Sequence, residues 1–148
     1  MRHILFSLFI LMGFQSMKAQ DNSSWKLILN KKNLITSFNF DDSSSNVIEI
    51  KKADLSNNGV LKIEYIESAL EKARGGWMRS IALFDTTGEV IARQDSVQQL
   101  AFYNKDVLRM IWNRKKMGVY TWSYPIDKSM AAVIRIRRYR LCTMVLVD

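Results

Sequence analysis

The chain has 148 residues, and 22 Lys and Arg against 14 Asp and Glu give it a formal net charge of +8. It contains one cysteine and one histidine, so an internal disulfide is excluded and so are sites that need several imidazole rings. The length fits one domain with its own hydrophobic core.

Residues 1–19 have the segment order of a secretory signal peptide. Arg2 precedes a nearly unbroken apolar run at residues 4–14, and a polar stretch leads to Ala19. The apolar run is shorter than the roughly 20 residues that cross a bilayer, which favours a signal peptide over a membrane anchor. We expect cleavage after Ala19, although Met17 is larger than the small residue usual at the third position before the cleaved bond, so the exact bond is not fixed by the sequence. A single exported domain is expected over residues 20–148.

Cleavage at that bond removes His3 and two basic residues, so the mature chain has 20 basic and 14 acidic residues and a formal charge of +6. Nucleophiles activated by histidine are then excluded, because each needs a ring nitrogen as general base. We expect neither a metal nor a cofactor. Apolar neighbours predict that Cys142 is a small buried side chain. The alternative is a reactive or intermolecular thiol.

Short segments typical of strands run along the mature chain, most with apolar residues at every second position. They cover residues 25–29, 47–51, 60–66, 78–84, 89–94, 117–124 and 133–147. Turn residues separate them. The Asn58-Gly59 pair predicts a tight hairpin, and so does D-T-T-G at residues 85–88, where Gly88 can take a left-handed conformation. A polar loop is expected at residues 41–46.

The spacing of apolar residues changes to that of a helix after residue 103. Asn104 is the predicted N-cap, Gly118 ends the element, and one apolar face is formed by Val107, Leu108, Ile111 and Trp112. A second helical turn is predicted over residues 67–74, closed by Gly75 and Gly76. The predicted fold class is therefore all-β, an antiparallel β-sandwich with one or two short helices.

Residues 80–91, S-I-A-L-F-D-T-T-G-E-V-I, are followed by G-V-Y-T-W-S-Y at residues 118–124. This order resembles small immunoglobulin-like modules of exported bacterial proteins, including the C-terminal sorting domains of type 9 secretion cargo. The resemblance implies an immunoglobulin-like fold and an envelope or extracellular location. Two features depart from it: sorting domains are appended to a larger cargo, and the final R-L-C-T-M-V-L-V-D lacks the lysine-bearing strand expected there.

Four arginines follow one another closely in R-I-R-R-Y-R, and they are Arg135, Arg137, Arg138 and Arg140. A bulge at Arg137 and Arg138 would place all four on the solvent side of a strand over residues 133–147. They would then form an anion-binding stripe for phosphate, sulfate or carboxylate polymers. The alternative is a solvated strand face that discourages edge pairing.

Aromatic residues are the second group of candidate contacts. Trp77 follows A-R-G-G and is expected to be partly exposed, where it can contact a ligand, whereas Trp112 and either Trp122 or Tyr120 are expected to be buried. Carboxylates are the third group. Glu64 with Glu67, or Asp41 with Asp42, are the pairs that a glycoside hydrolase would use, and the two aspartates would also suit a calcium loop.

Two functional hypotheses remain. The first is an exported, non-enzymatic binding module of the periplasm or extracellular space, which contacts an envelope glycan, in particular an anionic one, or a partner protein. The alternative is a small carboxylate-based hydrolase that acts on an extracellular glycan. Nucleic acid is not an expected partner, and no transmembrane span is expected in the mature protein. A pocket with two facing carboxylates would favour the hydrolase.

Overall fold

The computed structural model describes residues 22–38, 40 and 46–148. The predicted signal peptide and most of the predicted loop at residues 41–46, with Asp41 and Asp42, lie outside them. The elements in chain order are β1 (Ser24–Leu29), β2 (Lys32–Ser37), β3 (Val47–Lys51), the 3-10 helix η1 (Lys52–Leu55), β4 (Val60–Ile66), α1 (Ala69–Arg74), β5 (Trp77–Phe84), β6 (Val90–Asp95), β7 (Gln99–Tyr103), α2 (Asn104–Ile111), β8 (Lys116–Pro125), α3 (Lys128–Val133) and β9 (Tyr139–Val147).

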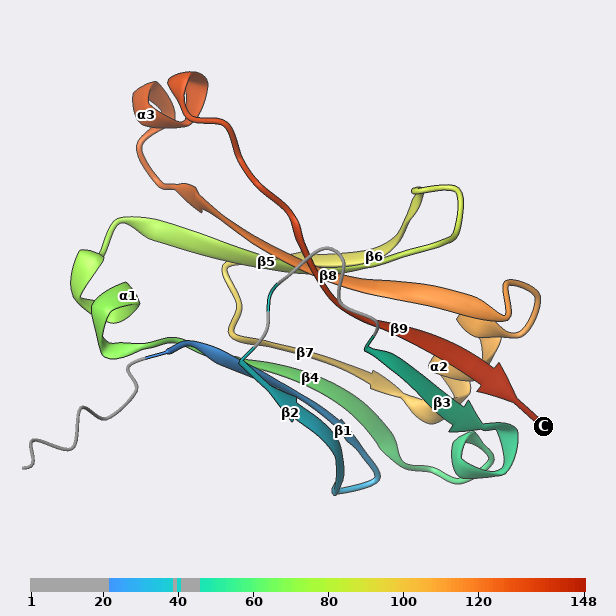
Figure 1. The fold of residues 1–148 in the computed structure, drawn as a ribbon. Coiled ribbons are helices and arrows are strands. Elements are labelled where there is room, and N and C mark those ends of the chain that lie inside the picture. Colours follow the sequence, from blue (N-terminus) through green and yellow to red (C-terminus); the bar gives the residue numbers. More distant parts are fainter. Residues whose placement is uncertain (1–21, 39, 41–45) are drawn as a thin grey trace, which may run out of the picture.

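The strands form two sheets, which confirms that the protein is mostly β (Figure 1). A four-stranded sheet has the order β2-β1-β4-β7, and a five-stranded sheet has the order β3-β9-β8-β5-β6. Neighbouring strands are antiparallel except β3 and β9, which are parallel. The second sheet is therefore mixed, unlike the fully antiparallel arrangement expected from the sequence.

One hydrophobic core lies between the two sheets, because both contribute side chains to the same cluster. The four-stranded sheet contributes Trp25, Leu27, Leu61, Ile63 and Leu100, and the other sheet contributes Ile50, Ile81, Leu83, Met117, Val119, Cys142 and Met144. Helix α1 lies at one end of the sheets, and α2 with η1 lies at the other (Figure 1). Since each strand turns every second side chain inward, inward positions near the end of β4, the start of β5 and the end of β8 meet near α1.

Strand β9 begins at Tyr139, so the predicted strand over residues 133–138 is wrong. Val119 of β8 pairs with Cys142 and Tyr120 pairs with Arg140, which makes Leu141 the extra residue of a bulge. The bulge predicted at Arg137 and Arg138 is therefore also wrong. Two consecutive residues at the observed bulge, Leu141 and Cys142, are both buried. The chain needs this bulge because the apolar residues after it are one position out of phase with Tyr139.

The Asn58-Gly59 pair does not form a hairpin, since β3 and β4 belong to different sheets and η1 stands between them. A Cβ atom on Gly59 would lie 1.6 Å from Asn30 Oδ1, so close packing is what requires glycine here. Nor is Asn104 the N-cap of α2, a position that Tyr103 occupies. Asn104 is fully buried, and its Nδ2 donates to Asn30 Oδ1 and Asn57 Oδ1. These contacts join the β1–β2 turn and the segment after η1 to the start of α2.

Other local predictions are confirmed. Strands β3 and β4 have the predicted bounds, and α1 ends at Gly75 and Gly76, both with positive φ. The D-T-T-G segment joins β5 to β6, with Gly88 at φ 87° and Asp85 Oδ1 accepting from the Thr87 and Glu89 amides. No helix in the described part of the chain is long and apolar enough to cross a membrane.

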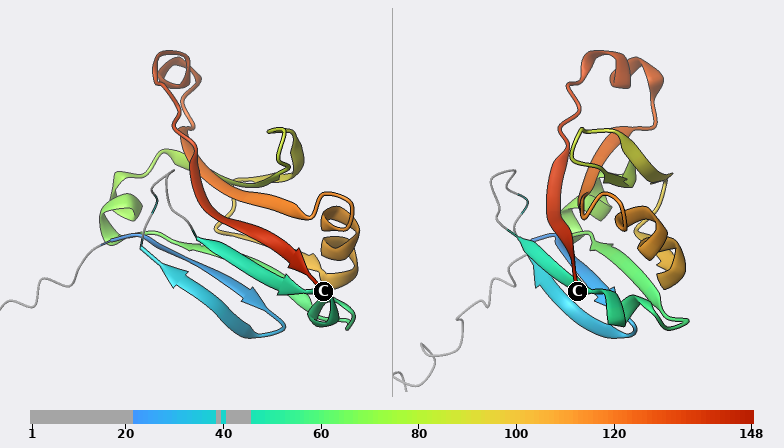
Figure 2. Two further views of the ribbon diagram at one scale, coloured as in Figure 1. Left: turned by 45° about the vertical axis from the view of Figure 1, so that its right-hand side comes forward. Right: turned by 90° about the vertical axis from the view of Figure 1, so that its right-hand side faces the viewer.

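Residues 126–138, which we call the arm, connect β8 to β9 and contain α3. The arm extends away from both sheets in every view (Figure 1, Figure 2). Helix α3 has no buried residue, and the Asp127 side chain caps it by accepting from the Ser129 amide at 2.8 Å.

Candidate functional site

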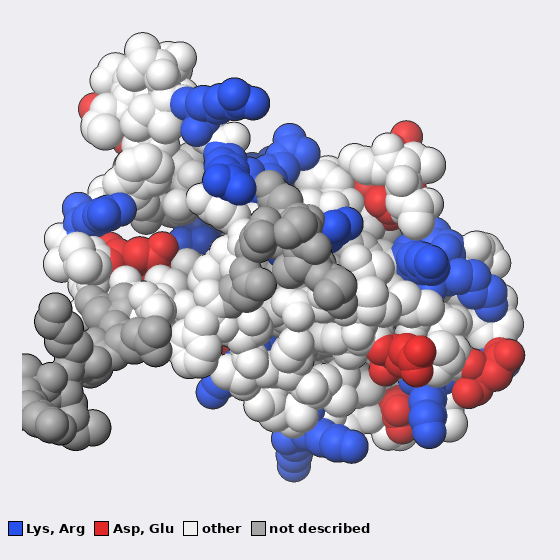
Figure 3. Space-filling view, in the orientation of Figure 1, with Lys and Arg blue, Asp and Glu red and all other residues white. Residues whose placement is uncertain are grey.

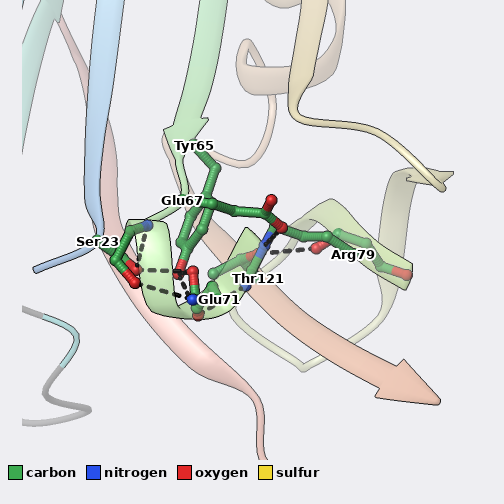
Figure 4. Close-up of polar contacts among 8 residues, drawn as sticks. Ser23, Tyr65, Glu67, Glu71, Arg79 and Thr121 are labelled. Atoms are coloured by element: carbon green, nitrogen blue, oxygen red, sulfur yellow. Dashed lines mark hydrogen bonds and ion pairs between the residues drawn. The ribbon is translucent and has the colours of Figure 1, made fainter. Parts of the chain in front are cut away.

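A buried arginine occupies a core-facing position at the α1 end of the sheets. Arg79 of β5 is 6% exposed and shares its strand face with Ile81 and Leu83. Its Nη2 lies 3.2 Å from Glu71 Oε1, and its Nη1 donates to Thr121 Oγ1 at 3.3 Å (Figure 4). Both contacts hold the guanidinium between the sheets. The inward-facing side chains of β5 are therefore apolar at Ile81 and Leu83 but charged at Arg79.

Two further groups complete the charge balance around Arg79. Nε lies 3.9 Å from Glu67 Oε1 and makes no hydrogen bond within the described residues. The guanidinium carbon lies 3.4 Å from the centroid of the Tyr65 ring, which is a cation–π contact. Because Arg79 is desolvated, two carboxylates and an aromatic face are needed to stabilise its charge.

Helix α1 positions Glu71 for these contacts. Ser68 is its N-cap and accepts from the Glu71 amide at 3.1 Å, so the glutamate sits at the third helical position near the positive end of the helix. Ser23 Oγ donates to Glu71 Oε2 at 2.6 Å and accepts from the Ser68 amide at 3.1 Å. The start of β1 and the start of α1 are thereby joined at one carboxylate.

Tyr65 contributes a hydroxyl to the same carboxylate. Its Oη donates to Glu71, lying 3.1 Å from Oε1 and 3.0 Å from Oε2. Burial raises the pKa of Tyr65 to about 12, although Ser23 and Arg79 oppose the shift. The phenol is therefore a fixed hydrogen-bond donor at neutral pH rather than an acid or base.

Two adjoining clefts open beside this network. The larger has a volume of about 570 Å³, within the range of roughly 300–1,000 Å³ for small-molecule sites, and Phe38, Phe40 and Tyr139 give it aromatic walls. The smaller has a volume of about 110 Å³ and is lined by Glu67, Trp77 and Met78. Glu71, Arg74, Arg79 and Ser123 line both clefts. We call the two together the α1-end cleft.

The structure places Trp77 at the edge of this cleft. Its side chain is 42% exposed, which confirms the expected partial exposure. Trp122 is buried as predicted, and Tyr120 is half-buried. The prediction for Trp112 is wrong: it is 41% exposed at the C-terminal end of α2, where the Lys52 ammonium lies 4.1 Å from its ring centroid. Two half-exposed indoles thus lie at opposite ends of the molecule.

The four predicted arginines do not line one strand face. Arg135, Arg137 and Arg138 belong to the arm and are exposed, whereas Arg140 is half-buried in β9 and lines a separate cleft with Lys116. The Arg137 guanidinium lies 5.0 Å from the Tyr139 ring centroid. Arg138 lies 5.5 Å from the ring of Phe84 and 5.6 Å from that of Trp122. The chain around residue 138 is therefore packed on the sheet.

The carboxylates proposed from the sequence are separated. Glu64 forms an ion pair with Lys62 on β4, whereas Glu67 faces Arg79. It is Glu71 that joins Glu67 at the α1-end cleft, and the sequence analysis did not single it out. Among the described residues no three His, Cys, Asp or Glu side chains gather as a metal site requires.

Sequence reasoning missed Arg79, Glu71 and Tyr65. One signal was present: in the strand M-R-S-I-A-L-F, Arg79 occupies the same alternate positions as Ile81 and Leu83. A charge at a core-facing position needs a partner, which predicts a buried ion pair or a site.

No family model matches the chain, and no curated protein matches it either.

Proposed function

We propose that this protein is an exported, non-enzymatic binding module that binds a glycan in the α1-end cleft. The observation that carries the proposal is the meeting of two clefts at the Arg79–Glu71 pair, with the half-exposed Trp77 at their edge. We also infer that the two sheets form an immunoglobulin-like β-sandwich, because both pack against one core.

The chemistry of the lining suits a sugar. An indole face contacts the C–H groups of a sugar ring, and the carboxylate, guanidinium and hydroxyl groups around it bind hydroxyls. Arg74, which is exposed and lines both clefts, and Ser123 are the groups on the cleft surface. The buried network behind them is already hydrogen-bonded, so it holds the lining in place without rearrangement.

The formal charges of the cleft decide which glycan fits best. Glu67 and Glu71 balance Arg74 and Arg79, so the cleft has no excess of either sign. Neutral, hydroxyl-rich sugars are therefore favoured over strongly acidic polymers, although Arg74 can contact a single acidic group.

Hydrolysis is the less favoured function. A glycosidase needs one carboxyl group as acid and a second as base or nucleophile, on either side of the bond that breaks. Glu67 and Glu71 instead both face the Arg79 guanidinium. The two carboxylates therefore lie beside one cation rather than on either side of a bound sugar, which leaves the hydrolase as the alternative hypothesis.

A glycan array with the chain from Gln20 onward tests the proposal, followed by affinity measurements on the glycans that bind. Trp77→Ala is expected to weaken binding at least tenfold, about 1.4 kcal/mol. Trp112→Ala removes an equally exposed indole at the other end of the molecule and is the matched control. Equal loss in both variants, or loss in the control alone, contradicts the assignment. Release of shortened glycan would instead support the hydrolase.

A further inference from the structure

The arm carries four apolar side chains that the described chain leaves exposed. Ile126 is 57% exposed, Met130 44%, Val133 83% and Ile136 42%. A helix of a domain this size ordinarily buries one face against the core, yet α3 buries none. Exposed apolar residues scattered singly need no explanation, but four of them on one projecting segment indicate a contact surface.

Basic residues accompany these apolar side chains. The arm contains Lys128, Arg135, Arg137 and Arg138 against one acidic residue, Asp127, so its formal charge is +3. The Asp127 carboxylate accepts from the amide and hydroxyl of Ser129, at 2.8 and 2.7 Å. It is therefore engaged within the arm. Lys and Arg side chains are seen along the arm and at its base in Figure 3.

The base of the arm is fixed, so its direction is set by the fold. The Arg138 guanidinium packs over the Phe84 and Trp122 rings on the outer face of the five-stranded sheet, and Arg93 approaches the same Trp122 ring at 5.0 Å. From this base the arm extends outward to α3, which lies farther from the sheets than the rest of the arm (Figure 1, Figure 2). Met130 and Val133 belong to α3.

We propose that the arm docks on an anionic lipid bilayer. Interfacial segments place apolar side chains at the boundary between headgroups and acyl chains while cations contact the lipid phosphates. The arm offers both side by side, with Met130 and Val133 next to Lys128 on α3 and Ile136 between Arg135 and Arg137 on the returning segment. Six residues of α3 are far too few to span a bilayer, so the contact is peripheral. This inference goes beyond the proposed glycan site, with which it shares no residue.

Sedimentation with lipid vesicles tests the proposal, using the chain from Gln20 onward, which contains every residue that the structure describes. Vesicles of phosphatidylcholine alone are compared with vesicles that contain phosphatidylglycerol. We expect binding to the anionic vesicles at least tenfold tighter than to the neutral ones, and reduced by added salt because exposed charges are screened. Absence of binding to anionic vesicles overturns the proposal, and an arm that docks on a protein would give that result.

Matched variants separate the arm from the general positive charge of the chain. Val133→Asp and the double variant Arg135→Gln/Arg137→Gln are each expected to weaken vesicle binding at least tenfold. Val90→Asp, at a 53% exposed valine of β6, and Arg109→Gln/Arg114→Gln, at exposed arginines beyond the arm, make the same chemical changes elsewhere. Equal losses in arm and control variants overturn the proposal. Unchanged thermal unfolding of all four variants excludes misfolding as the cause.

Discussion

At the scale of single residues, the α1-end cleft depends on one buried charge. Arg79 is desolvated, and its stability rests on Glu71, on Glu67 and on the Tyr65 ring. Removing one partner of a buried ion pair is more destabilising than removing a surface pair, since the remaining charge cannot regain its hydration. The same residues hold the cleft lining, so the proposed binding would be coupled to folding stability here.

Glu71→Ala is expected to lower the free energy of unfolding by about 3 kcal/mol, because it leaves the Arg79 guanidinium and the Tyr65 and Ser23 hydroxyls without their acceptor. Glu71→Gln keeps an oxygen acceptor and is expected to cost less. Glu64→Ala breaks the more exposed pair with Lys62 and should cost less than about 1 kcal/mol. Urea unfolding measures all three, and similar values for Glu71→Ala and Glu64→Ala would contradict the role of the network.

Cys142 is predicted to make the protein less stable at alkaline pH. Burial raises the pKa of its thiol from 9.0 to about 12. As the pH rises, the unfolded chain therefore loses this proton before the folded protein does. The contribution of Cys142 to the free energy of unfolding is complete below pH 9 and is lost as the pH rises to 12. Tyr65 acts in the same direction between pH 10 and 12.

The measurement is urea unfolding at pH 8 and pH 11. Between these two pH values the free energy of unfolding of Cys142→Ala should fall by about 2 kcal/mol less than that of the wild type. A thiol reagent should also react slowly with the native protein and rapidly in denaturant. Equal reaction rates in the two states would mean that the thiol is exposed.

At the scale of elements, local periodicity predicted strands well and their interruptions poorly. β3 and β4 have the predicted bounds because their apolar residues alternate without a break. α3 was missed because six residues are too few to reveal a helical face, especially with its apolar side chains exposed. The alternation I-R-I at residues 134–136 is typical of a strand, but this segment pairs with no strand in the described chain. β2 was missed because it lacks a fully buried side chain.

Limited trypsin digestion is expected to cut first within the arm, after Lys128, Arg135 or Arg137. Exposed segments that lack buried side chains open locally at low cost. The two fragments should remain associated, because β8 and β9 pair over residues on both sides of the cut. Mass spectrometry of early digests identifies the bond, and first cleavage inside either sheet would contradict this description of the arm.

At the scale of the whole molecule, the alternation of apolar residues predicted the class of fold and left the location of the site open. Alternating short segments sufficed to predict a mostly β protein with one core, since each strand must bury one face. The candidate site depends on contacts between β4, α1, β5 and β8, which pattern along the chain does not reveal. The partial exposure of Trp77 was predictable because A-R-G-G before it indicates a turn. The arginines at residues 135–140 were identified in the sequence, but the course of the chain there depends on α3.

Export predicts the N-terminus of the mature protein. Purified from its native host, the chain should begin at Gln20 or Asp21, because residues 1–19 have the pattern of a cleaved signal peptide. Intact-mass spectrometry measures this directly. Recovery of the protein from the cytosol with Met1 in place would contradict export.

The glycan-binding role of the α1-end cleft is tested most directly by recording indole N–H resonances while the protein is titrated with a glycan that binds on the array. The four tryptophans report from different places: Trp77 lies at the cleft, Trp112 at the opposite end, and Trp25 and Trp122 are buried. We predict that the Trp77 resonance shifts progressively with glycan concentration while the Trp112 resonance stays in place. A shift at Trp112 with Trp77 unchanged would contradict the account.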